Sequence, residues 1–170
     1  MSQDLSTQSR FVTLLKQKGT GKTMSKALSA EQCQECEILL QDATVSTTTK
    51  ATLLVAFIML EQTEIEQKWF DSLKENYQHI VPEACYFLFD KTIIPADFPP
   101  DFCTLIRHVL THQSLTTTEM TTGSRYCLDA SIPDYPKAIF LEGLRLKEES
   151  SEENTASLSL LQEHSTRHSV

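Results

Sequence analysis

The segment Gly19-Thr-Gly-Lys-Thr23 holds the residue types with which a P-loop binds nucleotide phosphates. That motif also needs a glycine at the position of Lys16 and a strand before the loop, whereas the flanking sequence predicts a helix. Glycine is the usual residue where a helix stops. We therefore interpret residues 19–23 as a helix-terminating loop.

Cys33 and Cys36 have the spacing of a zinc-ligand pair, but a structural zinc site of this kind needs a second pair. The remaining cysteines are isolated, at Cys85, Cys103 and Cys127. Both members of the pair fall on the apolar face of a predicted helix, where cysteine behaves as a small hydrophobic residue. We expect the pair to be buried in the core.

His108 and His112 are four residues apart and would share one face of a continuous helix, as paired zinc ligands do. The helix is expected to end between them, which makes polar surface the better interpretation. The acidic cluster at 148–153 lies near a predicted helix N-terminus, where negative charge is stabilised, with a partner site as the alternative. We predict no catalytic residue, cofactor or metal ligand.

Composition narrows the class of protein. The chain has 170 residues with 40% hydrophobic side chains, 4 glycines and a net charge of -8. The acidic balance argues against nucleic-acid binding, which relies on lysine and arginine. The longest apolar run, residues 51–60, is about half the length of a membrane helix. With five cysteines and no recognisable leader, we expect a cytoplasmic protein.

Helical periodicity with repeated cap signals predicts an all-α fold. A short helix is expected at 11–16. A capping box at Ser29 and Gln32 opens a second helix, and Thr47 is the expected N-cap of a third, which is apolar nearly all round and should be central. A further capping box at Thr63 opens a fourth. The expected buried positions of the second and fourth helices are Cys33, Cys36, Leu39, Leu40, Ala43, Ile65, Trp69, Phe70, Leu73 and Tyr77.

The same signals return 87 positions later, which predicts an internal duplication. Thr116 and Glu119 repeat the capping box, Asp134 is the expected N-cap of the second central helix, and Ser150 opens a last one. Val55, Ile58 and Leu60 become Glu142, Arg145 and Lys147, so one face of that helix should be wet or paired with charge.

The prediction is two small bundles of about four helices each, joined by a proline-rich connector. The segments are a disordered N-terminus at 1–9, a first copy at 10–79, the connector at 80–100, a second copy at 101–163 and a disordered tail at 164–170. Within the connector, 83–91 could be a short helix or a strand, and 93–100 is irregular because of its prolines.

The second copy resembles the small helical N-terminal domain of the anthranilate phosphoribosyltransferase family, also called glycosyl transferase family 3. The likeness rests on a leucine followed by the Thr116 cap, on Pro133-Asp134, and on Phe140-Leu141 with Leu144-Arg145-Leu146-Lys147, followed by the 149–153 acidic segment. In the family this module precedes a catalytic α/β domain that binds phosphoribosyl pyrophosphate and magnesium. The glycine-rich motifs of that domain have no counterpart here, so the resemblance transfers no catalytic residue.

Two functions follow from the resemblance. The first is a noncatalytic helical interaction or dimerisation module, forming a homodimer or binding another protein. The second is a truncated or split phosphoribosyltransferase subunit that acts with a separate catalytic chain. In the family the leading helices mediate dimer contact, which suggests an interaction surface at Phe11, Leu14, Leu15, Phe102, Leu105 and Ile106.

Overall fold

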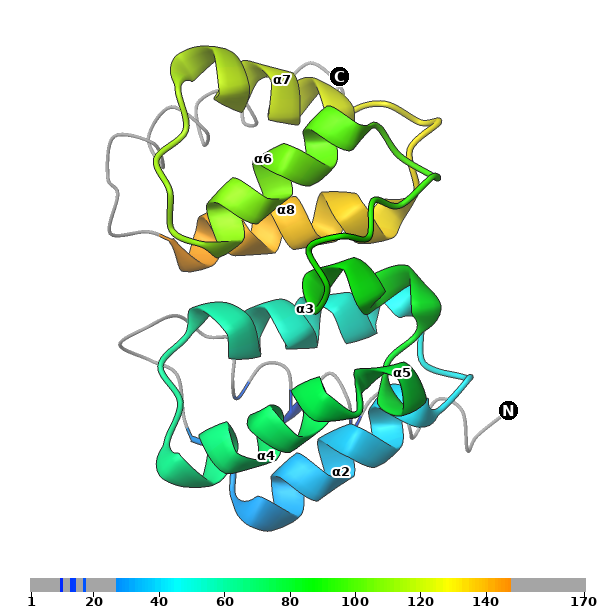
Figure 1. Cartoon of the computed structure of the whole chain (residues 1–170), viewed down its shortest axis with the longest axis vertical. Helices are drawn as coiled ribbons and strands as arrows, with labels where there is room; N and C mark the ends of the chain where they lie inside the picture. Colours follow the sequence, from blue (N-terminus) through cyan, green and yellow to red (C-terminus); the bar gives the residue numbers. More distant parts are fainter. Residues whose placement is uncertain (1–9, 11–12, 15–16, 18–26, 148–170) are drawn as a thin grey trace.

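Figure 1 shows the computed structural model, which describes residues 10, 13–14, 17 and 27–147. Every regular element in this part of the chain is helical, which confirms the all-α prediction there. None of these helices is long and apolar enough to cross a membrane. The elements are α2 (Ala30–Gln41), α3 (Thr47–Met59), α4 (Glu64–Glu75), α5 (Tyr77–Ile80), the 3₁₀ helix η1 (Glu83–Leu88), α6 (Pro100–Leu110), α7 (Thr117–Cys127) and α8 (Asp134–Leu146).

Helices α3 and α8 lie side by side at the centre of the molecule, and no other two described helices make so extensive a contact. In Figure 1, α2, α4 and α5 lie on one side of this central pair, and α6 and α7 lie on the other. Helix α3 therefore needs apolar side chains on opposite faces. That need explains why it is apolar nearly all round.

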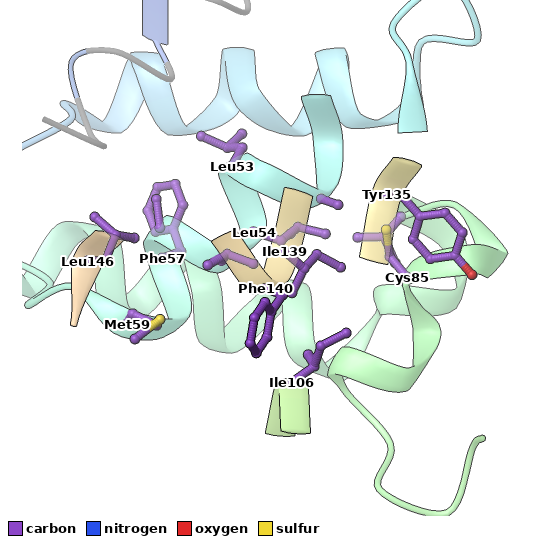
Figure 2. Packing of buried hydrophobic residues seen from close by; sticks show 14 of the residues in the cluster. Leu53, Leu54, Phe57, Met59, Cys85, Ile106, Tyr135, Ile139, Phe140 and Leu146 are labelled. Atoms are coloured by element: carbon purple, nitrogen blue, oxygen red, sulfur yellow. The ribbon is translucent and has the colours of Figure 1, made fainter. Parts of the chain in front are cut away.

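One hydrophobic cluster runs through both sides of the central pair. On the α3 side, the Phe57 ring centroid lies 5.0 Å from that of Trp69. On the α8 side, Phe140 lies 5.5 Å from Phe102. Figure 2 shows Leu54, Ile139 and Phe140 gathered where the central helices meet. The two halves thus share a core, and each buried side chain of this size contributes about 1.5–3 kcal/mol to folding.

The predicted capping boxes at the starts of α2, α4 and α7 are confirmed. The hydroxyls of Ser29, Thr63 and Thr116 each accept a backbone N–H three residues later, and the side chain there binds back to the cap. The predicted N-caps of the central helices are wrong by one residue. Ser46 caps α3 and Pro133 precedes α8, so Thr47 and Asp134 are first helical residues instead.

Equivalent elements begin 87 positions apart. Ala30 and Thr117 open α2 and α7, and Thr47 and Asp134 open α3 and α8. The turns between them also match: an aspartate side chain accepts from the backbone N–H and the hydroxyl of the residue two positions later, in Asp42–Thr44 and in Asp129–Ser131. The correspondence seen in the sequence therefore extends to the starts of these helices and to the geometry of the turns.

Several predicted details of the first half differ from the structure. Ala43 is exposed in the turn after α2, and α4 ends at Glu75, so Tyr77 belongs to α5. Ile65 is 52% exposed instead of buried. Its place on α4 is the reason: at 3.6 residues per turn it lies about 90° from the centre of the face formed by Glu66, Trp69, Phe70 and Leu73.

The connector contains the 3₁₀ helix η1, followed by an irregular stretch that ends where Pro100 opens α6 as its first residue. Arg107 holds this stretch in place. Its Nη2 donates to the backbone carbonyl of Ile93 at 2.6 Å and approaches those of Phe87 and Asp90 at 3.4 Å. The partly buried guanidinium of Arg107 thus ties the end of η1 and the start of the irregular stretch to α6.

The charged positions of α8 have different surroundings. Arg145 is exposed and pairs with Glu142 on the same helix. Lys147 is buried, and its Nζ donates to the backbone carbonyl of Gln113. Of the α8 positions that correspond to Val55, Ile58 and Leu60, Arg145 is therefore exposed to solvent, while Lys147 is buried and makes a charge-assisted hydrogen bond.

Candidate interaction groove

The cysteine pair lies in the core, as predicted. Cys33 and Cys36 are 1% and 0% exposed, and all cysteines of the chain are free thiols. Burial raises the pKa of Cys36 to about 12, with the neighbouring Cys33 adding to the shift. A thiol that stays protonated at neutral pH is a poor nucleophile and a poor metal ligand. No group of three or more His, Cys, Asp or Glu residues with metal-site geometry occurs in the described part of the chain.

The two histidines are separated by the end of their helix. Helix α6 stops at Leu110, and His112 follows with a φ of 60°. His108 instead faces α7, where its Nδ1 lies 3.3 Å from an oxygen of Glu119. The pKa of Glu119 is lowered mainly by the backbone N–H of Thr116, with a smaller contribution from His108. These residues belong to the α6–α7 contact. The 19–23 loop and the 148–153 cluster lie outside the described residues.

The side chains expected to form an interaction surface on α6 face inward. Phe102 and Ile106 are fully buried and Leu105 is 5% exposed. Leu14 is likewise buried, whereas Phe11 and Leu15 lie outside the described residues. The α6 residues are used in packing against α7 and α8, so the described chain does not present them to a partner.

A groove with a volume of about 510 Å³ lies between α2 and α4 instead. Each wall contributes residues at positions i, i+3, i+4 and i+7, so the groove follows both helices for two turns. Its lining consists of Ala30, Cys33, Gln34 and Glu37 on α2 and Ile65, Lys68, Trp69 and Ser72 on α4. Figure 1 shows these two helices next to one another, on the side of the molecule away from α8.

Trp69 makes the apolar side of this groove rigid. Its indole packs against Phe57 at 5.0 Å and against Phe70 at 6.2 Å between ring centroids. Its Nε1–H donates to the Glu37 carboxylate across the groove at 3.2 Å. A buried aromatic ring with a satisfied polar group has little freedom to move. The floor is therefore preformed.

One exposed isoleucine lines the groove. Ile65, on the α4 wall, is 52% exposed. Exposed large apolar side chains beside a preformed depression are a feature of protein-binding surfaces. The sequence assigned Ile65 to the core, although its angular distance from the buried face of α4 was a signal that it lies outside.

A second depression lies over the connector, with a volume of about 510 Å³. Its defining contact is the hydroxyl of Tyr135, which donates to the Asp97 carboxylate at 2.7 and 2.8 Å. Burial, followed by the hydrogen bond to Asp97, raises the pKa of Tyr135. The phenol stays protonated and fastens α8 to the connector. We assign this contact a structural role.

Comparison with known proteins identifies no relative. No protein-family model matches the chain, no curated protein matches it, and no solved structure matches it. The described residues define the class only as an all-α protein, with a groove between α2 and α4.

Proposed function

We propose that this chain is a noncatalytic helical interaction module, derived by internal duplication and related to the N-terminal domain of anthranilate phosphoribosyltransferase-like proteins. It binds another protein by accepting one of that protein's helices in the α2–α4 groove. The module acts in the cytoplasm, a placement supported by five cysteines that are all free thiols.

The observation that carries this proposal is that the exposed side chain of Ile65 lies beside the buried Trp69 ring in the groove. Burying Ile65 would remove from water an apolar side chain that is 52% exposed. Burial of a whole isoleucine contributes about 1.5–3 kcal/mol, and central apolar anchors dominate the energy of helix-in-groove complexes.

The test is affinity capture with the full chain, comparing Ile65→Asp with Ile94→Asp. Both isoleucines are exposed, at 52% and 59%, but Ile94 lies in the connector outside the groove. The same protein should be captured by the wild type and by Ile94→Asp and lost with Ile65→Asp, with all three chains showing equal thermal unfolding. Equal capture by both variants would contradict the proposal. So would a strict monomer in sedimentation that captures nothing specific.

The same experiment separates the proposal from the split-enzyme alternative. A captured chain that carries a phosphoribosyltransferase α/β domain would point to that alternative. Adding phosphoribosyl pyrophosphate and magnesium to the pair should then give turnover that neither chain gives alone. A captured protein that gives no turnover supports the noncatalytic role.

A further inference from the structure

The depression over the connector, here called the connector pocket, has the size of a small-molecule site. It lies between residues 83–87 of η1, residues 93–97 and Tyr135 of α8. Its volume of about 510 Å³ falls within the range of about 300–1,000 Å³ that is usual for ligand pockets. No residue lines both this pocket and the α2–α4 groove, so the two depressions are separate.

Aromatic side chains form part of the pocket wall, and their neighbours hold them in place. Phe87 and Tyr135 both pack edge-on against Phe98, with ring centroids 5.7 and 5.9 Å from that of Phe98. In Figure 2 the Tyr135 hydroxyl points away from the other labelled side chains. Tyr86 is held by its hydroxyl, which donates to the backbone carbonyl of Gln78 at 2.8 Å. Aromatic rings attract cations, and rings that are already ordered do so at a smaller entropic cost.

The charge of the lining selects the sign of the ligand. Glu83 and Asp97 line the pocket, and no basic side chain does. Asp97 accepts the Tyr135 hydroxyl at 2.7 and 2.8 Å, but a neutral phenol leaves the carboxylate charge uncompensated. Glu83 is exposed and pairs with no charged group in the described part of the chain. The α2–α4 groove differs, because its lining balances Glu37 with Lys68.

We propose that the connector pocket binds a small organic cation, an amine that carries its ammonium group on an apolar body. The apolar body packs against the Tyr86 and Phe87 side of the pocket. The ammonium group lies by the carboxylates, since each carboxylate oxygen of Asp97 can accept a further hydrogen bond and charge-assisted bonds are the stronger ones. The walls are a 3₁₀ helix and an irregular stretch, which offer no pair of helical ridges for a partner helix. This site is additional to the proposed function.

The test is isothermal titration calorimetry of the full chain with three probes that share a phenyl ring and differ in charge. They are 2-phenylethylamine, 2-phenylethanol and 3-phenylpropionate. At about pH 7 the amine should bind with a dissociation constant below about 1 mM. The alcohol should bind at least about tenfold more weakly, and the propionate should not bind. The preference for the amine should shrink at an ionic strength of about 0.5 M, where charges are screened beyond a few Å.

Two conservative variants place the amine in the pocket. Asp97→Asn removes the charge and keeps an oxygen that accepts the Tyr135 hydroxyl. Glu83→Gln removes the other charge at an exposed position, so it keeps the inference testable even if Asp97→Asn disturbs the connector. Each variant should weaken the amine by about two- to fivefold, as expected for a partly exposed charge pair, and leave the alcohol unchanged.

The chain offers a matched control for each variant. Asp101 accepts the Tyr126 hydroxyl at 2.6 Å and does not line the pocket, so Asp101→Asn is the control for Asp97→Asn. Glu64 is, like Glu83, an exposed glutamate in the first turn of a helix, so Glu64→Gln is the second control. Both controls should bind the amine with the affinity of the wild type.

NMR chemical shifts separate the connector pocket from the α2–α4 groove. Trp69 is the single tryptophan of the chain, so its indole N–H signal reports on the groove. The amine should shift the ring signals of Tyr86 and Tyr135 and leave the Trp69 signal in place. A shift at Trp69 instead, equal binding of the amine and the alcohol, no binding of the amine, or equal effects of pocket and control variants would each overturn the inference. The capture experiment is independent of these outcomes, since it depends on Ile65.

Discussion

The helices of the α2–α3 pair and of the α7–α8 pair begin 87 positions apart and are joined by matching turns, yet the two pairs are packed differently. Leu54 on α3 is fully buried, while its counterpart Leu141 on α8 is 37% exposed. Helix α3 is packed by η1 as well as by α8, and Phe87 and Leu88 of η1 lie beside Ile58. The comparison shows that equivalent positions of two similar helices can differ in burial, because different neighbouring elements pack against each helix.

The two pairs also divide side-chain volume differently. The first pair has Cys36 and Leu53 where the second has Gly123 and Phe140, and all are buried in helices. A Cβ added at Gly123 would lie 2.3 Å from the Phe140 ring. The larger ring in α8 therefore requires the loss of a side chain in α7.

The largest expected effect on stability comes from truncating one buried side chain in each half. Phe57→Ala should cost about 3–5 kcal/mol of unfolding free energy, because it removes a fully buried ring from the Trp69 and Phe70 cluster. Leu144→Ala, at the equivalent position, should cost about 2–3 kcal/mol, since fewer atoms are lost. Urea unfolding followed by circular dichroism measures both. A loss from Leu144→Ala as large as that from Phe57→Ala, although fewer atoms are removed, would show that the α8 side is packed at least as tightly as the α3 side, against the comparison.

An intermediate effect is expected from overfilling the α7–α8 contact. Gly123→Cys introduces the side chain of the first half and should cost about 1–3 kcal/mol, because the Phe140 ring cannot move aside freely. Adding Phe140→Leu should recover part of that loss, which a double-mutant cycle measures as a coupling energy.

Thr118→Cys is the control for this pair, since it puts the same side chain on the exposed face of α7. Its unfolding free energy should stay close to that of the wild type. Strictly additive effects of Gly123→Cys and Phe140→Leu would mean that the two positions do not compensate one another.

The smallest effect concerns the matched turns. The pKa values of Asp42 and Asp129 are lowered, first by a hydroxyl hydrogen bond from Thr44 or Ser131 and then by the backbone N–H of the same residue. Each contributes stability above the ordinary carboxyl pKa of about 3.9, and loses it as the pH falls through the lowered value.

Carbon-detected NMR titration should therefore place both carboxyl groups below the ordinary value. Thr44→Val and Ser131→Val should raise the pKa of their partners by similar amounts, because each removes one hydroxyl donor and keeps the backbone N–H. Different responses would show that the two turns, unlike the helices, had diverged. An ordinary pKa at either aspartate would contradict the shared geometry.

Local rules account for what could be predicted from the sequence. The capping boxes at Ser29, Thr63 and Thr116 depend on side chains three residues apart, so their geometry follows from the chain itself. The same holds for the end of α6 between His108 and His112, and for burial of Cys33 and Cys36 on a continuous apolar face. The all-α fold of the described residues follows from these local signals together with the helical period.

Tertiary packing decided the rest. The sequence could not indicate that α3 and α8 pack against each other, since their contact joins residues far apart in the chain. For the same reason it could not show that Phe102, Leu105 and Ile106 would be used inside the molecule, or that Ile65 would stay at the surface. Periodicity identifies an apolar face, but only the neighbouring helices determine whether that face is covered. The groove between α2 and α4 exists because no other described helix covers the faces that line it.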